Sequence, residues 1–478
     1  MRPLGPIDAG FIAIESRATP MHVGSLLLLR PPSGAGSDYL QELFQQCIGV
    51  KEFRAPFDQH LVYPASRLGL PHWDTDPDFD IEYHFRHSAL PAPGRYRELF
   101  VLVSRLHGTL LDRTRPLWEY SLIEGINTGQ FALYAKMHHA QVDGTAGMRL
   151  LQASLSEDPD ERNVPLMWAK DGRGWKQAEA PERPTHKGFE RVLEGIGAQL
   201  GVLPNVGRAI ARTVAAYQRP RDERMAAPFE GPRSVLNTKV TGARRFVAQS
   251  YSLERIHRVR EAFGATVNDI VLAMSSSALR RYLSEFGGGV PERPLTAMTP
   301  VAVRPRDADD FGNATSAVLV NLATNMEDPV RRLHTIQASI RDGRSLIKEL
   351  AFNEVILYTA LMSTPLMLPS LLGLGSLVTP TNIVISNVPG PKKTLYWNGA
   401  RLDGMYPVSL VYHGMAANIT VTSYAGSLDF GIVACRRTVP RVQRIIDFLE
   451  DGLTELERAA AIPRGESLAM TAGGGGAD

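Results

Sequence analysis

Several features that identify common classes of protein are scarce in this sequence of 478 residues. It has only two cysteines, Cys47 and Cys435, which excludes a disulfide framework and fits a reducing compartment. Its 52 Lys and Arg nearly balance its 50 Asp and Glu, so the net charge of +2 does not favour a nucleic-acid partner. The N-terminal segment has no apolar stretch of signal-peptide length, which predicts that the protein is not secreted.

Motifs for two common kinds of catalytic centre are also missing. There is no HExxH or CxxC spacing, so the sequence predicts no metal site. There is no GxSxG turn for a serine nucleophile, which favours direct transfer chemistry over an acyl-enzyme. The remaining composition, with 44% hydrophobic and 21% charged residues, is that of an ordinary globular protein.

Two segments could meet a membrane. Residues 355–391 carry no charge, but prolines and glycines interrupt them, which favours a buried helix and strand over an exposed apolar patch. Residues 186–225 have seven Lys or Arg against four Asp or Glu, with apolar residues at helical spacing. This second pattern fits an amphipathic helix on an anionic membrane and a solvated connecting helix equally well.

The most informative stretch that is present is residues 137–144 (MHHAQVDG), which has the form HHxxxDG. A neutral imidazole can take a proton from a hydroxyl that attacks a carbonyl, because its unperturbed pKa of about 6.5 lies near working pH. Apolar and other residues alternate over 131–138, which predicts a strand, and Met148, Leu151 and Leu155 recur at helical spacing. The histidine pair, His138 and His139, is therefore predicted where a strand ends and a helix begins.

The chain resembles the bacterial wax ester synthase/diacylglycerol acyltransferase family over almost its whole length. HHxxxDG alone would indicate only a wider superfamily of CoA-dependent acyltransferases and condensation domains, but further blocks in the same order are more specific. These blocks are residues 4–8 (LGPID), 20–24 (PMHVG), 115–119 (RPLWE), 267–270 (VNDI), 386–391 (SNVPGP) and 405–409 (MYPVS).

The resemblance implies an α/β fold of two chloramphenicol-acetyltransferase-like mixed-sheet domains with a substrate tunnel between them. Strands are expected within 21–30, 60–90, 117–126 and 131–138, and helices near 38–50 and 97–113. The second unit is expected to contain a buried helix over 267–283, a closing helix over 439–461 and several strands. Those strands are placed at 246–248, 295–303, 317–324, 381–386, 410–411, 419–423 and 428–433.

Shifts in composition suggest where these units begin and end. The predicted boundaries are an N-terminal domain over residues 1–160, a helical crossover linker over 161–235 and a C-terminal domain over 236–465. A disordered tail is expected over 466–478, which contains four consecutive glycines.

The resemblance also assigns roles around the motif. It makes His139 the general base, whereas His138 is expected to be structural and Gly144 to leave room for a substrate. Asp143 could orient His139 as in a triad, or could point away and pair with an arginine, for which Arg304 is the candidate. The second reading of Asp143 is favoured.

Further candidates lie outside the motif. Asn268 could cap the predicted helix, with Asp269 in its first turn, or could place its amide near the reacting carbonyl as an oxyanion donor. Asn387 and Gly390 occupy a predicted turn that would shape the tunnel wall. Trp118 is expected to pack in the core, with contact to an acyl chain as a further role.

A competing motif, HxxxxD, runs from His107 to Asp112 and is similar to one in glycerol-phosphate acyltransferases. With two fixed positions it is weak, and the glycine-rich arginine motif of that family is absent downstream. We therefore do not expect these two residues to form the site.

The predicted function is transfer of a fatty acyl group from acyl-CoA to a long-chain alcohol or diacylglycerol. Acyl-CoA would be a substrate, and no cofactor is expected. The resemblance further implies a cytoplasmic enzyme associated peripherally with the inner membrane or lipid inclusions, without a nucleic-acid partner. The alternatives are a condensation-type enzyme that uses carrier-bound acyl groups and a non-catalytic lipid-binding protein.

Overall fold

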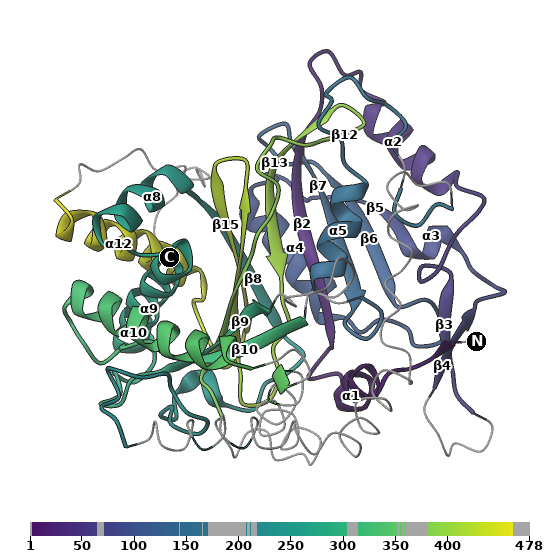
Figure 1. Cartoon of the computed structure of the whole chain (residues 1–478). Helices are drawn as coiled ribbons and strands as arrows, with labels where there is room; N and C mark the ends of the chain where they lie inside the picture. Colours follow the sequence, from purple (N-terminus) through teal and green to yellow (C-terminus); the bar gives the residue numbers. More distant parts are fainter. Residues whose placement is uncertain are drawn as a thin grey trace.

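Two six-stranded mixed sheets stand next to each other, and helices pack on both of them (Figure 1). The computed structural model describes residues 2–64, 71–142, 144–164, 166–170, 218–303, 314–350 and 380–461, and positions 207, 211, 354, 355 and 358. A small three-stranded sheet in the order β1-β4-β3 completes the described strands. It consists of β1 (Arg2–Pro3), β3 (Gln59–Val62) and β4 (His72–Thr75).

The N-terminal sheet has the strand order β12-β13-β2-β7-β6-β5. Its strands are β2 (His22–Arg30), β5 (Phe85–Ala89), β6 (Trp118–Glu124), β7 (Phe131–His138), β12 (Tyr396–Trp397) and β13 (Ala400–Val408). The strands predicted over 21–30, 117–126 and 131–138 are confirmed, and the region 60–90 contains three short strands, with β3 beginning one residue earlier.

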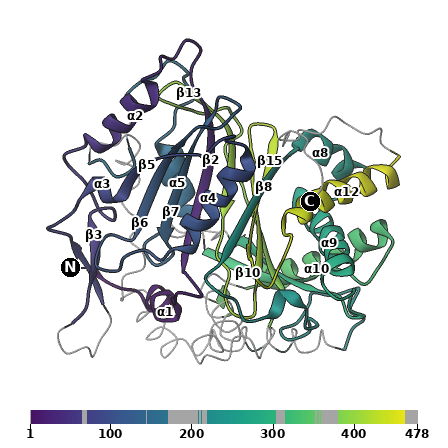
Figure 2. The ribbon, with the colours of Figure 1, turned by 180° about the vertical axis from the view of Figure 1, so that it is seen from behind.

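Helices cover both faces of this sheet. Helix α4 (Tyr96–Gly108) lies on one face and α5 (Gly144–Ala153) on the other, as the two opposite views show (Figures 1 and 2). Leu26 and Leu28 of β2 pack toward α4, whereas Leu27 and Leu29 belong to the cluster on the α5 side. A strand that is buried on both faces reads as a continuous apolar run rather than an alternating one, as β2 does.

The C-terminal sheet has the order β10-β9-β11-β14-β15-β8. Its strands are β8 (Arg244–Ser252), β9 (Thr296–Val303), β10 (Ala314–Asn321), β11 (Ile383–Val388), β14 (Ala417–Tyr424) and β15 (Ser427–Cys435). Helices on its outer side are α8 (Leu253–Ala262), α9 (Val267–Phe286), α10 (Pro329–Lys348) and α12 (Gln443–Ala459). Short elements elsewhere are α1 (Pro6–Ile14), α2 (Tyr39–Ile48), α3 (Ile81–His84) and η1 (Val235–Asn237).

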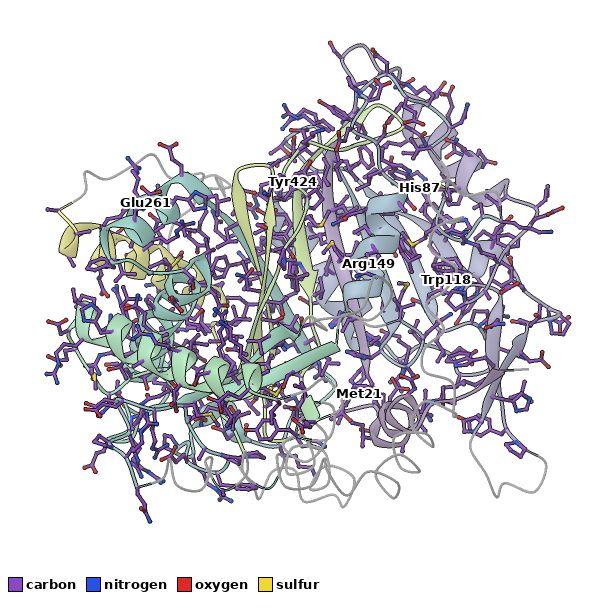
Figure 3. All side chains as sticks on the ribbon, in the orientation of Figure 1. Met21, His87, Trp118, Arg149, Glu261 and Tyr424 are labelled. Atoms are coloured by element: carbon purple, nitrogen blue, oxygen red, sulfur yellow. The ribbon has the colours of Figure 1, made fainter. Side chains whose placement is uncertain are left out.

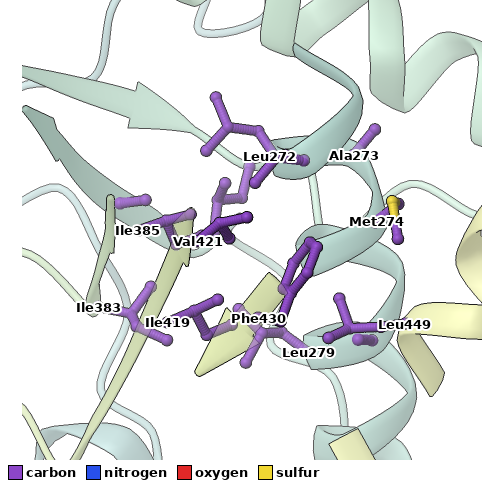
Figure 4. Close-up of a cluster of buried hydrophobic side chains, with 14 of the residues drawn as sticks. Leu272, Ala273, Met274, Leu279, Ile383, Ile385, Ile419, Val421, Phe430 and Leu449 are labelled. Atoms are coloured by element: carbon purple, nitrogen blue, oxygen red, sulfur yellow. The ribbon is translucent and has the colours of Figure 1, made fainter. Parts of the chain in front are cut away.

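Helix α9 forms the centre of the C-terminal core. Its Leu272 and Leu279 pack on Ile385 of β11 and on Val421 and Phe430 of the neighbouring strands, all of them buried (Figure 4). The predicted buried helix over 267–283 is therefore confirmed. Among the described residues, no single helix is long and apolar enough to cross a membrane; α8 and α9 pass that test only as a pair bent by 99°.

The strand predicted at 410–411 is wrong, because the strand in this region is β13, which ends at Val408. Gly404 and Pro407 interrupt the apolar pattern of β13, and its pairing with β2 shifts between Leu402 and Gly404, so the sequence signal was weak. Strand β13 lies between β12 and β2 in the N-terminal sheet although it comes from the C-terminal half of the chain. No single boundary therefore separates the two sheets, and the predicted domain limits stay predictions.

A buried carboxylate links the two sheets. Asp429 of β15 accepts hydrogen bonds from the Met405 N–H of β13 (2.8 Å) and from the hydroxyls of Ser250 and Ser427 (both 2.7 Å). The Ser250 hydroxyl lies 2.9 Å from that of Tyr406 on β13. Burial, only partly offset by these hydrogen bonds, raises the pKa of Asp429 to about 6.

We therefore predict a pH-dependent stability term from Asp429. The folded state binds this proton more tightly than the unfolded state does, so stability falls as pH rises from about 4 to about 6. A pKa raised from 3.8 to about 6 corresponds to about 3 kcal/mol of stability that is lost over this range. Urea unfolding across this range should show that slope in the wild type but not in Asp429→Asn, and equal slopes would contradict the assignment.

Candidate active site

The two histidines of the motif lie at the end of β7 and face opposite sides of the sheet. The His138 N–H donates to the Leu117 carbonyl and the His139 N–H donates to the Met21 carbonyl, both at 2.9 Å. Side chains alternate along a strand, so Ala135 and Met137 share the face of His139. These three residues line a cavity of about 380 Å³ between the two sheets, whereas His138 lies outside its wall.

His139 is half-buried in the cavity wall, and its ring stacks on that of Phe11 from α1. The ring centroids are 4.3 Å apart and the planes are inclined by 23°. Phe11 and Ile14 place α1 over one side of the cavity. A histidine that lines an apolar cavity between two sheets can reach a substrate held there.

His138 is fully buried in a polar network behind the cavity. Its Nδ1 accepts the Ala140 N–H at 3.0 Å, which leaves Nε2 to carry the proton. Nε2 lies 3.4 Å from Glu15 Oε1, and Glu15 directly follows α1.

Glu15 links this network to His139 through Met21, whose carbonyl accepts the His139 N–H. This role of Glu15 was not predicted from the sequence. Its Oε2 accepts from Arg113 Nε (3.0 Å) and Nη2 (2.9 Å), and its Oε1 accepts the Met21 N–H (3.0 Å). Burial raises the pKa of Glu15, but the neighbouring His138 imidazole and the bonds from the Met21 N–H and Arg113 bring it below its usual value. One acidic residue after an apolar helix gives no sequence signal for such a network.

The cavity wall from the C-terminal sheet is more polar than the wall from the N-terminal sheet. The side chains of Ile383, Ile385, Ile419 and Val421 on β11 and β14 pack in the core (Figure 4). The residues that alternate with them face the cavity. The cavity-facing residues of these strands are Val384, Ser386, Val388, Asn418, Thr420 and Thr422.

Hydroxyl and amide groups on this wall are joined to one another. The Thr420 hydroxyl donates to Asn418 Oδ1 at 2.9 Å and lies 2.6 Å from the Ser409 hydroxyl. The Thr422 hydroxyl is buried and has no hydrogen-bond partner in the described part of the chain. Such groups suit the polar part of a bound molecule.

Several predicted site residues can be compared with this cavity, and others cannot. Asp143 and Arg304 lie outside the described residues, so their pairing stays a prediction. Gly144 is the first residue of α5, as the predicted change from strand to helix requires. Three residues later, Gly147 lines the cavity.

Asn268 is not the N-cap of α9, as one reading of the sequence had it. Thr266 is the N-cap: its hydroxyl accepts the Asp269 N–H (3.2 Å), and the Asp269 carboxylate accepts the Thr266 N–H (2.9 Å). This reciprocal capping box explains the position of Asp269. Asn268 does not line the cavity, and its Nδ2 is buried without a partner among the described residues.

The segment predicted as a turn lies beside the cavity, but Asn387 is within strand β11 and not in a turn. Asn387 sits between two cavity-lining residues of β11, Ser386 and Val388, and is not itself part of the wall. Gly390 packs against the end of β14: a Cβ there would lie 2.3 Å from the Ser423 carbonyl oxygen, so only glycine fits.

Trp118 is a core residue and does not line the cavity. It is fully buried, its Nε1–H donates to the Phe57 carbonyl at 2.8 Å, and its ring stacks on His84 (Figure 3 labels Trp118 in the N-terminal half). Tyr120, two residues along β6, does line the cavity. The wall residue is therefore Tyr120, and Trp118 fills the core beside it.

The two residues of the HxxxxD motif have separate hydrogen-bond partners and do not form a site together. His107 is buried, with Nδ1 2.8 Å from the Tyr134 hydroxyl and Nε2 2.9 Å from the Ser409 carbonyl oxygen. Burial lowers the pKa of His107 to about 3. Asp112 instead accepts from the backbone and hydroxyl of Thr114. Within the described residues no three His, Cys, Asp or Glu could together hold a metal ion, and the lack of a metal stays a prediction.

Family models match the chain over most of its length. The wax ester synthase/diacylglycerol acyltransferase catalytic domain matches residues 4–271, and the C-terminal domain of the same family matches residues 311–457. A protein named probable diacylglycerol O-acyltransferase in Mycobacterium tuberculosis is 45% identical over 96% of this chain and 99% of its own length. The O-acyltransferase WSD of Acinetobacter baylyi is 40% identical over 96% of this chain and 98% of its own length.

Solved structures show the same arrangement. The wax ester synthase/diacylglycerol acyltransferase from Marinobacter aquaeolei VT8 is 41% identical, with a TM-score of 0.77 over 97% of this chain and 100% of its own. The first condensation domain of the CDA synthetase superposes with a TM-score of 0.58 at 18% identity, over 98% of this chain and 99% of its own. The second likeness concerns the fold alone.

Proposed function

The chain belongs to the wax ester synthase/diacylglycerol acyltransferase family and is an acyltransferase, and on this premise we propose how its cavity works. The acyl donor is a fatty acyl-CoA, the acceptor is the hydroxyl of a long-chain alcohol or of diacylglycerol, and His139 is the general base. Acyl-CoA is consumed as a substrate, so the proposal requires no resident cofactor.

One observation carries the proposal: His139 lines a mainly apolar cavity at the junction of the two sheets, whereas His138 is committed to Glu15 behind it. The apolar walls suit long alkyl chains, and the imidazole is the titratable side chain among the cavity-lining residues whose ordinary pKa suits proton transfer near neutral pH. The stack on Phe11 holds the ring in one orientation.

The proposed reaction is a single transfer. A ring nitrogen of His139 takes the acceptor's hydroxyl proton as the oxygen attacks the thioester carbonyl carbon. The tetrahedral intermediate then collapses, the carbon–sulfur bond breaks, and the CoA thiolate receives the proton from His139. The products are an ester and free CoA, and a positioned base of this kind typically contributes about 10²- to 10⁴-fold in rate.

The polar wall supplies a place for the parts of the substrates that are not alkyl chains. Ser409, Asn418 and Thr420 form a connected set of hydroxyl and amide groups on the side of the cavity that faces the C-terminal sheet. We assign the glycerol or thioester region to this wall because polar groups that line a cavity can hydrogen-bond the polar part of a bound molecule. Since both substrates are membrane lipids or amphiphiles, we also propose peripheral association with a membrane or lipid inclusion.

A carrier-dependent condensation enzyme is the second candidate of the same superfamily, and a lipid-binding protein is the third. Condensation domains share the fold at 18% identity, which says nothing about the donor. Activity with carrier-linked but not CoA-linked donors would favour the condensation reading. Binding of acyl-CoA without turnover would favour the lipid-binding reading.

We predict that the purified wild type releases CoA from palmitoyl-CoA only when an acceptor is present. Hexadecanol and a diacylglycerol should each support release, and their ratio ranks wax ester against triacylglycerol synthesis. Thiol detection of CoA, with chromatography of the ester, measures both products. No release with either acceptor would contradict the proposed function.

A further inference from the structure

Part of the cavity forms a slot between the N-terminal sheet and helix α5. Its floor consists of side chains that share one face of three paired strands: Val23 and Ser25 of β2, Ala135 and Met137 of β7, and Tyr120 of β6. Its roof consists of Gly147, Met148 and Leu151 on α5. We call this part the β7–α5 slot; His139 follows Met137 on the same face and stands at its end.

The β7–α5 slot differs from the opposite wall in being almost wholly apolar. The hydroxyl of Tyr120 already donates to Met167 Sδ at 2.8 Å, and only the Ser25 hydroxyl has no partner among the described residues. Tyr120 and Leu151 belong to the N-terminal core cluster, so core side chains close the slot. Such a slot suits an unbranched alkyl chain and offers little to a polar headgroup.

Gly147 occupies the one roof position without a side chain. A Cβ there would lie 3.5 Å from Val142 Cγ1 and 4.0 Å from Met137 Cε, which is ordinary van der Waals contact. The backbone therefore does not require glycine, and glycine weakens a helix interior relative to alanine. Glycine at this position instead leaves space beside Met137. Met137 precedes His139 by two residues and lies on the same face of β7.

We propose that the β7–α5 slot holds the alkyl chain of one substrate and that Gly147 is a specificity-determining residue that sets how long a chain fits. This inference rests on the proposed acyl transfer. An alkyl chain could come from the acyl-CoA or from the alcohol, and the chemistry of the slot is the same for both. Leu151, one helical turn beyond Gly147, lies farther along the roof, so bulk at residue 147 would close the route toward it.

The test compares Gly147→Ala and Gly147→Leu with the wild type in two substrate series. The first series varies acyl-CoA from hexanoyl to stearoyl with hexadecanol fixed, and the second varies the alcohol over the same lengths with palmitoyl-CoA fixed. In one series Gly147→Leu should lower kcat/KM for the longest chain by at least about tenfold relative to the shortest, with Gly147→Ala intermediate. The affected series identifies the chain that the slot holds.

The matched control is Gly10→Leu, because Gly10 is also a glycine within a helix, has nothing within 4 Å of its Cβ position and does not line the cavity. Its chain-length profiles should match the wild type. Unchanged profiles in Gly147→Leu, or an equal loss for every length, would overturn the proposal while leaving acyl transfer intact. An inactive wild type would instead contradict the proposed function. Gly147→Ala keeps the test decisive if the leucine variant does not fold.

Discussion

Replacement of His139 by alanine is expected to lower kcat by about 10²- to 10⁴-fold while the protein stays folded. The imidazole is the group at the cavity that can take the hydroxyl proton, and its removal takes away the ring that stacks on Phe11. KM for acyl-CoA should change little, because the base acts on the acceptor in the transition state. Initial rates of CoA release, with thermal unfolding of the same samples, measure both effects.

His334→Ala is the matched control for this loss, since His334 is an exposed histidine on α10 far along the chain from the motif. It should keep wild-type kcat. A His139→Ala enzyme that retained more than about a tenth of wild-type turnover would show that another group takes the proton.

Replacement of Glu15 by glutamine is expected to destabilise the fold by about 1–3 kcal/mol, because the charge-assisted bonds of a buried carboxylate are lost while Arg113, 36% exposed, stays within reach of water. The Glu15 side chain is 1% exposed and holds Arg113, the Met21 N–H and His138. Urea unfolding at pH 7 measures the loss. Because α1 and Met21 would move with Glu15, turnover should fall as well.

The effect of Glu15 should depend on pH with a definite sign. Its folded-state pKa is below the usual value, so its stabilising contribution is complete above the unfolded pKa and is lost as pH falls through the folded pKa. The difference between wild type and Glu15→Gln should therefore shrink in acid. Glu52→Gln removes an exposed carboxylate paired with Lys170 and should cost less than about 1 kcal/mol. A Glu15→Gln protein as stable as Glu52→Gln would refute the network's role.

Local patterns predicted much of this structure. The period-2 alternation over 131–138 correctly predicted the limits of β7 and the position of the histidine pair at its end. The pattern was clear because one face of that strand meets the cavity and the other face meets the core behind it. The apolar run around Leu26 to Leu29 likewise gave β2. The tunnel between two sheets came only from the family resemblance.

What the sequence did not predict depends on contacts between distant segments. Gly404 and Pro407 interrupt the strand pattern of β13 in the sequence. The position of β13 beside β2 depends on pairing between segments separated by more than half of the chain. Glu15 meets Arg113 and His138 only after three separate elements have packed together. The N-cap of α9, in contrast, is a local signal, since Thr266 and Asp269 have capping-box spacing.

The most direct test of the account is a single-turnover experiment with excess enzyme, labelled palmitoyl-CoA and hexadecanol. If His139 activates the alcohol for direct attack, free CoA and ester appear together at one rate in the wild type. In His139→Ala both should appear more slowly by about 10²- to 10⁴-fold, with palmitoyl-CoA binding unchanged. CoA released ahead of the ester, or palmitate trapped on the protein, would contradict direct transfer with His139 as the base.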